Sequence, residues 1–220
     1  MVFNEEALAW LTRSEPLTGC SLVTSLPDIS EFPSLTLAQW KVWFHDAAAL
    51  VLSRCPEEGV TIFYQTDVNR EGEWVDKAYL CQKAAEKMGH PLLWHKIVCR
   101  LPAGTISYGR PSYSHLICFS RGVKSQIALS TMDVLPQPGE VTWTRGMGVQ
   151  ACLTACQFIR SQTSTRTVVD PFCGHGTVLA VANGLGLDAI GVELVPKRAR
   201  KARALQSSRF TLVFGDEVSA

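Results

Sequence analysis

The stretch that decides the fold is Thr167-Val-Val-Asp-Pro-Phe-Cys-Gly-His-Gly-Thr-Val-Leu-Ala180. A run typical of a buried strand ends in Asp170, glycines follow at 174 and 176, and an apolar helical pattern begins at once. Such glycines let the backbone approach a ligand closely and aim the N–H groups of the helix at it. A tight strand-to-helix turn without a ligand is the alternative. A dinucleotide-binding fingerprint needs a third glycine where this chain has Leu179, which weakens a phosphate-binding interpretation.

A carboxylate ends the next predicted strand along the chain. About twenty residues after the glycine loop, Ala189-Ile-Gly-Val-Glu-Leu194 ends an apolar run with Glu193. A carboxylate in this place accepts hydrogen bonds from both hydroxyls of a ribose bound over the sheet edge. The loop and Glu193 together predict a ligand that contains adenosine.

Strand and helix patterns alternate through the rest of the chain. We therefore predict an α/β fold with a mostly parallel sheet and helices on both faces, closed by an antiparallel pair at 92–99 and 113–119. Residues 121–145 have weak periodicity and are predicted to be a connection. The other predicted strands cover 19–24, 60–64, 167–170, 189–193 and 210–214, and the predicted helices cover 5–11, 36–52, 75–88, 147–159, 177–185 and 197–206.

Two of these segments resemble motifs I and II of S-adenosylmethionine-dependent methyltransferases, particularly those that methylate amino groups of nucleic-acid bases. The motifs are Asp170-Pro-Phe-Cys-Gly-His-Gly176 and Ile190-Gly-Val-Glu-Leu194. The resemblance implies a Rossmann-like class I methyltransferase fold with a seven-stranded sheet. It also implies that the loop holds the methionine part of the cofactor and that Asp216, after a third strand, holds the adenine amine.

The order of the motifs resembles the circularly permuted class of this family. Leu22-Val-Thr-Ser-Leu-Pro-Asp28 is similar to the catalytic motif IV, and here it precedes motif I. The helix at 147–159, preceded by Thr144 and Arg145, matches motif X beside the methionine carboxylate. The resemblance implies one methyltransferase domain over residues 1–220, with a catalytic half (1–120), a connection (121–145) and a cofactor-binding half (146–220).

The resemblance also assigns roles to individual residues. Ser25 and the carbonyl of Leu26 accept hydrogen bonds from the target amine, in a catalytic set that comprises Ser25, Leu26, Pro27 and Asp28. Leu26 replaces the family's first proline and Asp28 replaces an aromatic, so the methylated atom stays open; Asp28 could instead only cap a turn. The predicted cofactor-binding residues are Thr24, Thr144, Arg145, Asp170, Pro171, Phe172, Cys173, Gly174, His175, Gly176, Thr177, Glu193, Leu194 and Asp216.

The segment from Asp67 to Lys77 follows another predicted strand end at the same sheet edge. We predict a substrate-facing loop in which Asp67 takes part, Arg70 and Lys77 contact phosphates and Trp74 stacks on a base. A solvated charged loop is the alternative.

Composition indicates an ordered protein, since 46% of the 220 residues are hydrophobic and 19% are charged. The net charge of +1 is the sum of −3 over residues 1–110 and +4 over residues 111–220. Eight cysteines without a CxxC pair predict reduced, buried thiols and no metal site. The first residues lack a signal-peptide pattern, and the longest uncharged stretch is too short and too rich in glycine to span a membrane. We expect an intracellular protein of the cytoplasm or nucleus.

The resulting prediction is a methyltransferase that uses S-adenosyl-L-methionine and modifies RNA, at a nitrogen of a base. RNA is favoured because only about 25 residues separate the two halves, which leaves no sizeable target-recognition insert. This small size also suggests a helper subunit or a homodimer. DNA and protein acceptors, a catalytically inactive cofactor-binding partner and a dinucleotide-dependent oxidoreductase are the alternatives.

Overall fold

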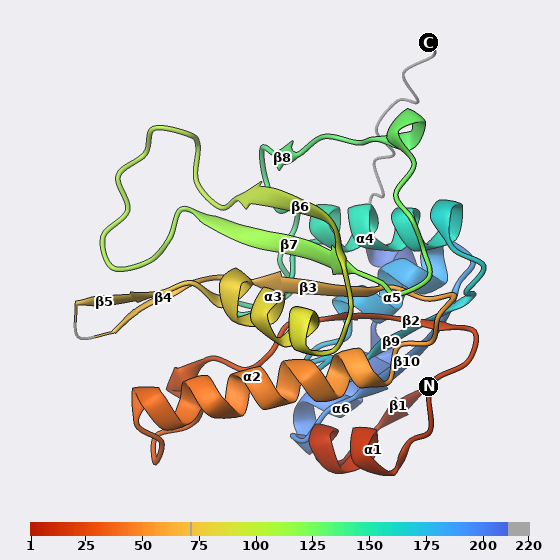
Figure 1. The fold of residues 1–220 in the computed structure, drawn as a ribbon, viewed down its shortest axis with the longest axis horizontal. Helices are drawn as coiled ribbons and strands as arrows, with labels where there is room; N and C mark the ends of the chain where they lie inside the picture. The colour runs from red at the N-terminus through yellow and green to blue at the C-terminus, as the bar shows by residue number, and fades with distance from the viewer. Residues whose placement is uncertain (71, 211–220) are drawn as a thin grey trace.

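A computed structural model of the chain describes residues 1–70 and 72–210. Its main sheet has eight strands among these residues, in the order β1-β10-β9-β2-β3-β7-β6-β8 (Figure 1). Strands β1, β10, β9, β2 and β3 run parallel, whereas β7 is antiparallel to both of its neighbours. The strands are β1 (Val2–Phe3), β2 (Cys20–Thr24), β3 (Thr61–Gln65), β6 (Leu92–Cys99), β7 (Tyr113–Phe119), β8 (Val134–Leu135), β9 (Thr167–Asp170) and β10 (Asp188–Val192).

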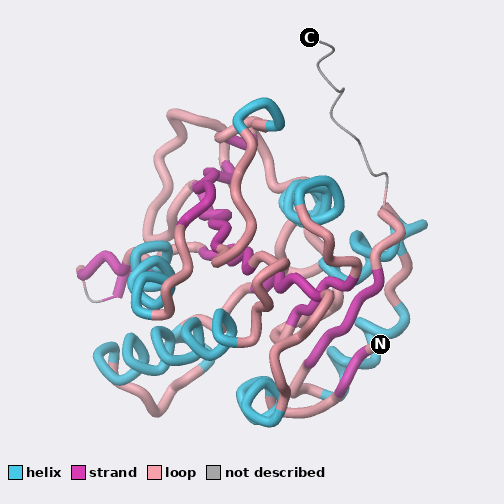
Figure 2. The backbone as a smooth tube through the Cα atoms, turned by 45° about the vertical axis from the view of Figure 1, so that its right-hand side comes forward, coloured by secondary structure: helices cyan, strands magenta, loops and turns pink. Residues whose placement is uncertain are grey.

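Helices cover both faces of this sheet (Figure 2). Buried residues of α1, α2 and α3 form one hydrophobic core with one face, and those of α4, α5 and α6 form a second core with the other. Among the described residues, no helix combines the length and apolar character that crossing a membrane requires. The helices are α1 (Ala7–Arg13), α2 (Leu37–Ser53), α3 (Lys77–Lys87), α4 (Val149–Gln162), α5 (Thr177–Gly184) and α6 (Pro196–Ala204).

Local sequence signals set several of these boundaries. Thr36 and Gln39 form a capping box at the start of α2, which satisfies backbone N–H groups that have no partner within the helix. Gly89 follows the end of α3 with a φ of 69°, a conformation that a side chain disfavours. At Gly191 in β10 a Cβ atom would lie 2.5 Å from Leu179, so this glycine lets α5 pack directly on the strand.

The predicted α/β architecture with a mostly parallel sheet is confirmed, but the strand number of seven was wrong. Two-residue strands, β1 and β8, lie at the edges of the sheet, and such short segments have no periodicity to detect. The predicted loop at 67–77 contains a separate hairpin of β4 (Val68–Arg70) and β5 (Glu73–Val75). The predicted strand at 210–214 falls, except for Phe210, outside the described residues, and so does Asp216.

Candidate active site

A cleft of about 780 Å³ opens at the carboxyl ends of β2, β3, β9 and β10. Parallel strands of an open α/β sheet carry their ligands at this edge. Most of the predicted site residues line the cleft: Ser25, Leu26, Pro27, Asp28, Asp67, Arg70, Lys77, Thr144, Arg145, Asp170, Pro171, Phe172, Cys173, Gly174, Thr177, Glu193 and Leu194.

Four predicted site residues lie elsewhere. Thr24 is fully buried under the cleft. The ring of His175 stacks on Trp143, with centroids 4.9 Å apart. At Gly176, which has a φ of 83°, a Cβ atom would lie 2.9 Å from Ala202, so this glycine allows α6 to approach the loop. Trp74 stands on β5 and is 49% exposed.

Trp143 covers the glycine loop, and the sequence analysis did not identify it. A Cβ atom at Gly174 would lie 3.1 Å from the indole ring, so any other residue there would push the ring away by a few tenths of an ångström. The ring also lies 4.8 Å from the guanidinium of Arg198, a cation–π contact. Trp143 therefore joins the connection, the glycine loop and α6 at one wall of the cleft.

Asp170, the last residue of β9, is buried beside the end of β2, which leads into the segment from Ser25 to Asp28. Its Oδ1 accepts hydrogen bonds from the Thr24 hydroxyl at 2.7 Å and from the Phe172 N–H at 3.1 Å. Burial raises the pKa of Asp170 to about 7, although these two hydrogen bonds lower it. Asp170 thus ties motif I to the strand that carries motif IV.

Glu193 follows β10 and is only 7% exposed. Burial raises the pKa of Glu193, while the hydrogen bond from the Val195 N–H at 2.7 Å lowers it. Asn4 donates to the carbonyls of Glu193 and Leu194, at 2.8 and 2.9 Å, and so holds this turn in place. The carboxylate is therefore fixed in the cleft wall, where a ribose could meet it.

Glu6 also lines this end of the cleft and was missed by the sequence analysis. It follows β1, the outermost strand beside β10, and its carboxylate accepts hydrogen bonds from the N–H groups of Leu8 and Ala9. The sequence feature that could have identified Glu6 is a pair of glutamates between the apolar Val2-Phe3 and an amphipathic helix.

Asp28 is held in two ways. One carboxylate oxygen accepts from the Ser30 N–H at 3.0 Å, which is the capping role considered for this residue. The other accepts from Lys77 Nζ at 2.7 Å. Burial raises the pKa of Asp28, but the charge and hydrogen bond of Lys77 outweigh it, so the net pKa is lowered. Because the Lys77 side chain is only 4% exposed and paired, it does not have the free ammonium expected of a phosphate contact.

Glu31 bridges the two halves of the chain across the cleft. Its carboxylate lies 3.4 Å from Arg145 and 3.7 Å from Arg198. Both arginines stand on the side of the glycine loop, whereas Glu31 follows motif IV.

Asp67 anchors the base of the β4–β5 hairpin. Its carboxylate accepts from the Lys77 N–H at 2.9 Å and from the indole of Trp74 at 3.2 Å, and it contacts His115 at 3.0 Å. Asp67, Asp76 and His115 each place one potential metal ligand within 4.8 Å of the others. Because Asp67 and His115 already have hydrogen-bond partners within the protein, we assign this cluster a structural role.

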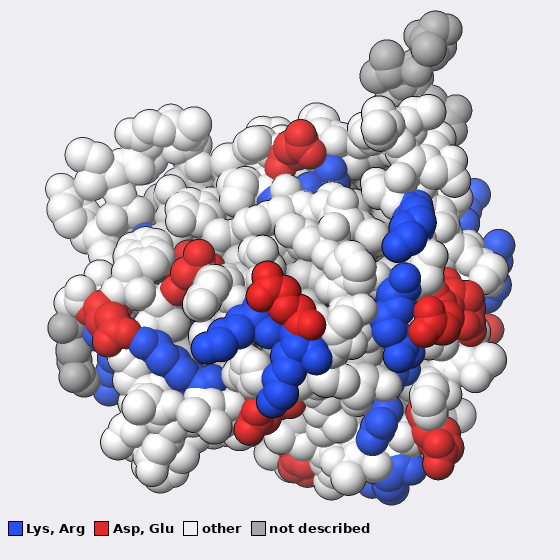
Figure 3. All heavy atoms as spheres, viewed as in Figure 1, with Lys and Arg blue, Asp and Glu red and all other residues white. Residues whose placement is uncertain are grey.

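Arginines surround the mouth of the cleft. Arg70 comes from β4, Arg100 and Arg110 come from the loop between β6 and β7, and Arg145 and Arg198 lie opposite. The cleft lining also holds six acidic residues, so basic and acidic side chains are mixed in it: Glu6, Asp28, Glu31, Asp67, Asp170 and Glu193. The outer face over α2 and α3 likewise mixes basic and acidic side chains (Figure 3).

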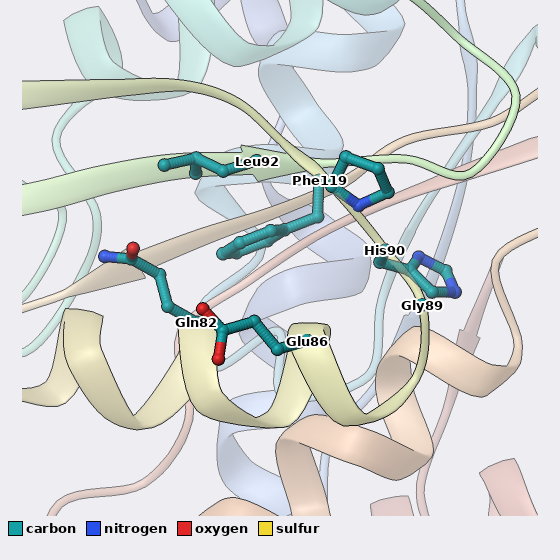
Figure 4. A pocket seen from close by; sticks show the side chains of 7 residues that line it. Gln82, Glu86, Gly89, His90, Leu92 and Phe119 are labelled. Atoms are coloured by element: carbon teal, nitrogen blue, oxygen red, sulfur yellow. The ribbon is translucent and has the colours of Figure 1, made fainter.

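A second, smaller hollow of about 330 Å³ lies between α3 and the β6–β7 pair (Figure 4). Leu92 and Phe119 form its apolar side, and Gln82 and Glu86 reach over it from α3. Burial lowers the pKa of the adjacent His90 to about 4. The hollow contains no predicted site residue.

The chain has the fold of class I methyltransferases, as three solved structures show, which confirms the predicted fold class apart from its circular permutation. A cytosine-N4-specific DNA methyltransferase, PvuII, matches with a TM-score of 0.71 and 18% identity over 99% of this chain and 87% of that one. TTHA0409 of Thermus thermophilus, named as a candidate DNA modification methylase and crystallised with S-adenosyl-L-methionine, matches with a TM-score of 0.67 and 18% identity over 92% and 91%.

A third similar structure is M1.HpyAVI in complex with SAM, with a TM-score of 0.61 and 11% identity over 93% of this chain and 98% of that one. No protein-family model and no curated protein matches the sequence. At these identities the likeness concerns the fold.

Proposed function

We propose that this protein is an S-adenosyl-L-methionine-dependent methyltransferase that modifies an exocyclic amine of a DNA base. One observation carries the proposal. The glycine loop after β9 and the segment from Ser25 to Asp28 after β2 line the same cleft, and the Thr24–Asp170 hydrogen bond joins the two strands. Cofactor and acceptor sites are thereby adjacent.

The residues present fit the cofactor. The buried carboxylate of Glu193 suits the ribose, and the backbone at Gly174, free of a side chain, suits the methionine part. The guanidinium of Arg145 is the cation that we assign to the carboxylate of the methionine part. Glu6, after the outer strand β1, takes the position that the resemblance gave to Asp216. The bound cofactor supplies a methyl group on a positively charged sulfur.

The chain's own residues orient the acceptor. The hydroxyl of Ser25 and the carbonyl of Leu26 would accept hydrogen bonds from the target amine and direct its lone pair at the methyl group, and the proton that the methylated amine loses would pass to water in the open cleft. Asp28 is a weak proton acceptor because Lys77 lowers its pKa. We therefore assign Asp28 to holding this loop in place.

The acceptor class changes from RNA to DNA in this proposal. RNA was favoured because the chain has no large recognition insert, but it covers 87% of PvuII methyltransferase and 91% of TTHA0409. Small size therefore does not argue against DNA. The permuted motif order remains part of the proposal, supported by β2 and β9 lying side by side although motif IV comes first in the sequence.

The test is incubation of the protein with tritiated S-adenosyl-L-methionine and, in parallel, unmethylated DNA, total RNA and a protein extract, followed by nucleoside analysis. We expect label in an amino-methylated base of DNA, and its loss in Ser25→Ala. Ser161→Ala, exposed on α4, is the control. Label in RNA alone would show that the acceptor is RNA and not DNA. Label only in protein would overturn the assignment to a nucleic acid.

A further inference from the structure

Gln65, the last residue of β3, has a side chain whose polar atoms are unsatisfied. It is 1% exposed and lines the cleft, yet neither its Oε1 nor its Nε2 has a hydrogen-bond partner among the described residues. Leaving a buried amide unpaired costs free energy, so such a group needs an explanation. Both atoms are closed to solvent in this conformation, so a ligand in the cleft would supply a partner when the side chain turns toward it.

Other polar side chains on this wall already have partners. The hydroxyl of Thr66 lies 2.6 Å from that of Ser114. The carboxylate of Asp67 accepts from two donors and contacts His115, and Asp28 is paired with Lys77. Gln65 is thus an uncommitted polar group beside the segment from Ser25 to Asp28.

The strand register places Gln65 on the acceptor side of the cleft. Phe63 pairs with Thr24, so Gln65 lies at the level of the segment that starts at Ser25. Because side chains alternate along a strand, Gln65 shares the face of Phe63, which packs in the same core as Leu26. The amide therefore lies near the backbone that is to hold the target amine.

We propose that Gln65 is the specificity-determining residue that reads the hydrogen-bonding edge of the acceptor base. The amide Nε2 donates to the ring-nitrogen acceptor that adjoins the exocyclic amine in adenine and cytosine, while both N–H groups of that amine are held by Ser25 and Leu26. The Watson–Crick edge of guanine, on which the amine adjoins an N–H donor, does not match this pattern. This inference rests on the proposed function and names the group that selects its acceptor.

Gln65→Leu tests the proposal because leucine keeps the approximate shape and removes both polar atoms. We expect unchanged cofactor binding and an unfolding midpoint equal to or above that of the wild type. We also expect about a 10- to 100-fold lower kcat/KM toward unmethylated DNA, because the hydrogen bond to the base is removed. Thr61→Val is the matched control, since it also replaces a buried polar residue of β3, at the end away from the cleft.

The outcomes separate the two proposals. Wild-type kcat/KM in Gln65→Leu would overturn the role of Gln65 and leave the methyltransferase assignment intact. A lower unfolding midpoint in Gln65→Leu would show that the amide stabilises the fold, which also overturns the inference. Label in methylated guanine would contradict the stated edge. Absence of transfer by the wild-type protein to any nucleic acid would overturn the proposed function together with this inference.

Discussion

The hydroxyl of Thr24 donates a hydrogen bond to Asp170 Oδ1 at 2.7 Å, across 146 residues of sequence. Thr24 ends β2, which leads into the segment from Ser25 to Asp28, and Asp170 ends β9, which leads into the glycine loop. Both side chains are buried, with exposed fractions of 0% and 4%. This contact therefore helps to fix the proposed acceptor site relative to the proposed cofactor site.

Thr24→Val should destabilise the protein. The change keeps the shape of the side chain but removes one of the two donors to the buried carboxyl of Asp170, which costs about 1–3 kcal/mol. Urea unfolding measures this loss, and Thr24→Ser, which keeps the hydroxyl, should lose less. Equal stability of Thr24→Val and the wild type would show that the hydrogen bond contributes nothing.

The stability of the fold should fall as pH rises toward neutrality. The pKa of Asp170 is raised from near 3.8 to about 7, so between these values the unfolded chain releases a proton that the folded protein keeps. The contribution is fully present below about pH 4 and is lost as pH rises through 7, with a slope of at most about 1.4 kcal/mol per pH unit. Asp170→Asn, which cannot ionise, should flatten this slope in urea unfolding from pH 5 to 8; an identical slope in both proteins would refute the assignment.

Much of the fold could be predicted from local patterns. The strands at 92–99, 113–119 and 167–170 have the predicted bounds, because each is a clear apolar run between turn residues. The end of α3 before Gly89 was likewise readable. In contrast, β1 has two residues, and only its pairing with Gly191 and Val192 makes it a strand.

The site was less predictable where it depends on contacts between distant segments. The sequence suggested a free cation at Lys77, but the fold places it beside Asp28, 49 residues away. Trp143 and Gln65 belong to no motif, and their positions follow from packing against the glycine loop and from the end of β3. A motif identifies the residues that a loop itself positions, but not those brought to it by the fold.

Glu193→Gln should weaken cofactor binding. The two ribose hydroxyls would make charge-assisted hydrogen bonds to this carboxylate. Its loss should therefore raise the Kd for S-adenosylhomocysteine by about 10- to 100-fold. Isothermal titration calorimetry measures this change. Asp188→Asn, at the exposed start of the same strand, should bind as the wild type does. If both variants bound with wild-type affinity, the ribose assignment would be wrong.

Replacing Arg100 and Arg110 together by glutamine should weaken DNA binding and reduce its salt dependence. The slope of log K against log salt should fall by about one for each arginine–phosphate interaction that the substitutions remove. Fluorescence anisotropy with a labelled duplex at several salt concentrations provides the measurement. Arg160→Gln, exposed on α4 and outside the cleft lining, is the control, and an equal effect there would indicate nonspecific attraction.

Lys77→Met should destabilise the catalytic segment, because it leaves the carboxylate of Asp28 without its cation. Removing one partner of a fully buried ion pair lowers the stability by about 3–5 kcal/mol. Because the Asp28 side chain is 31% exposed, we expect a smaller loss of about 1–3 kcal/mol. The pKa of Asp28 should rise, since burial alone raises it. The double variant Asp28→Asn/Lys77→Met should recover much of the loss, because neither an uncompensated charge nor its partner remains. Chemical denaturation of the four proteins in this cycle gives the coupling, and additive losses would mean that the two side chains act independently.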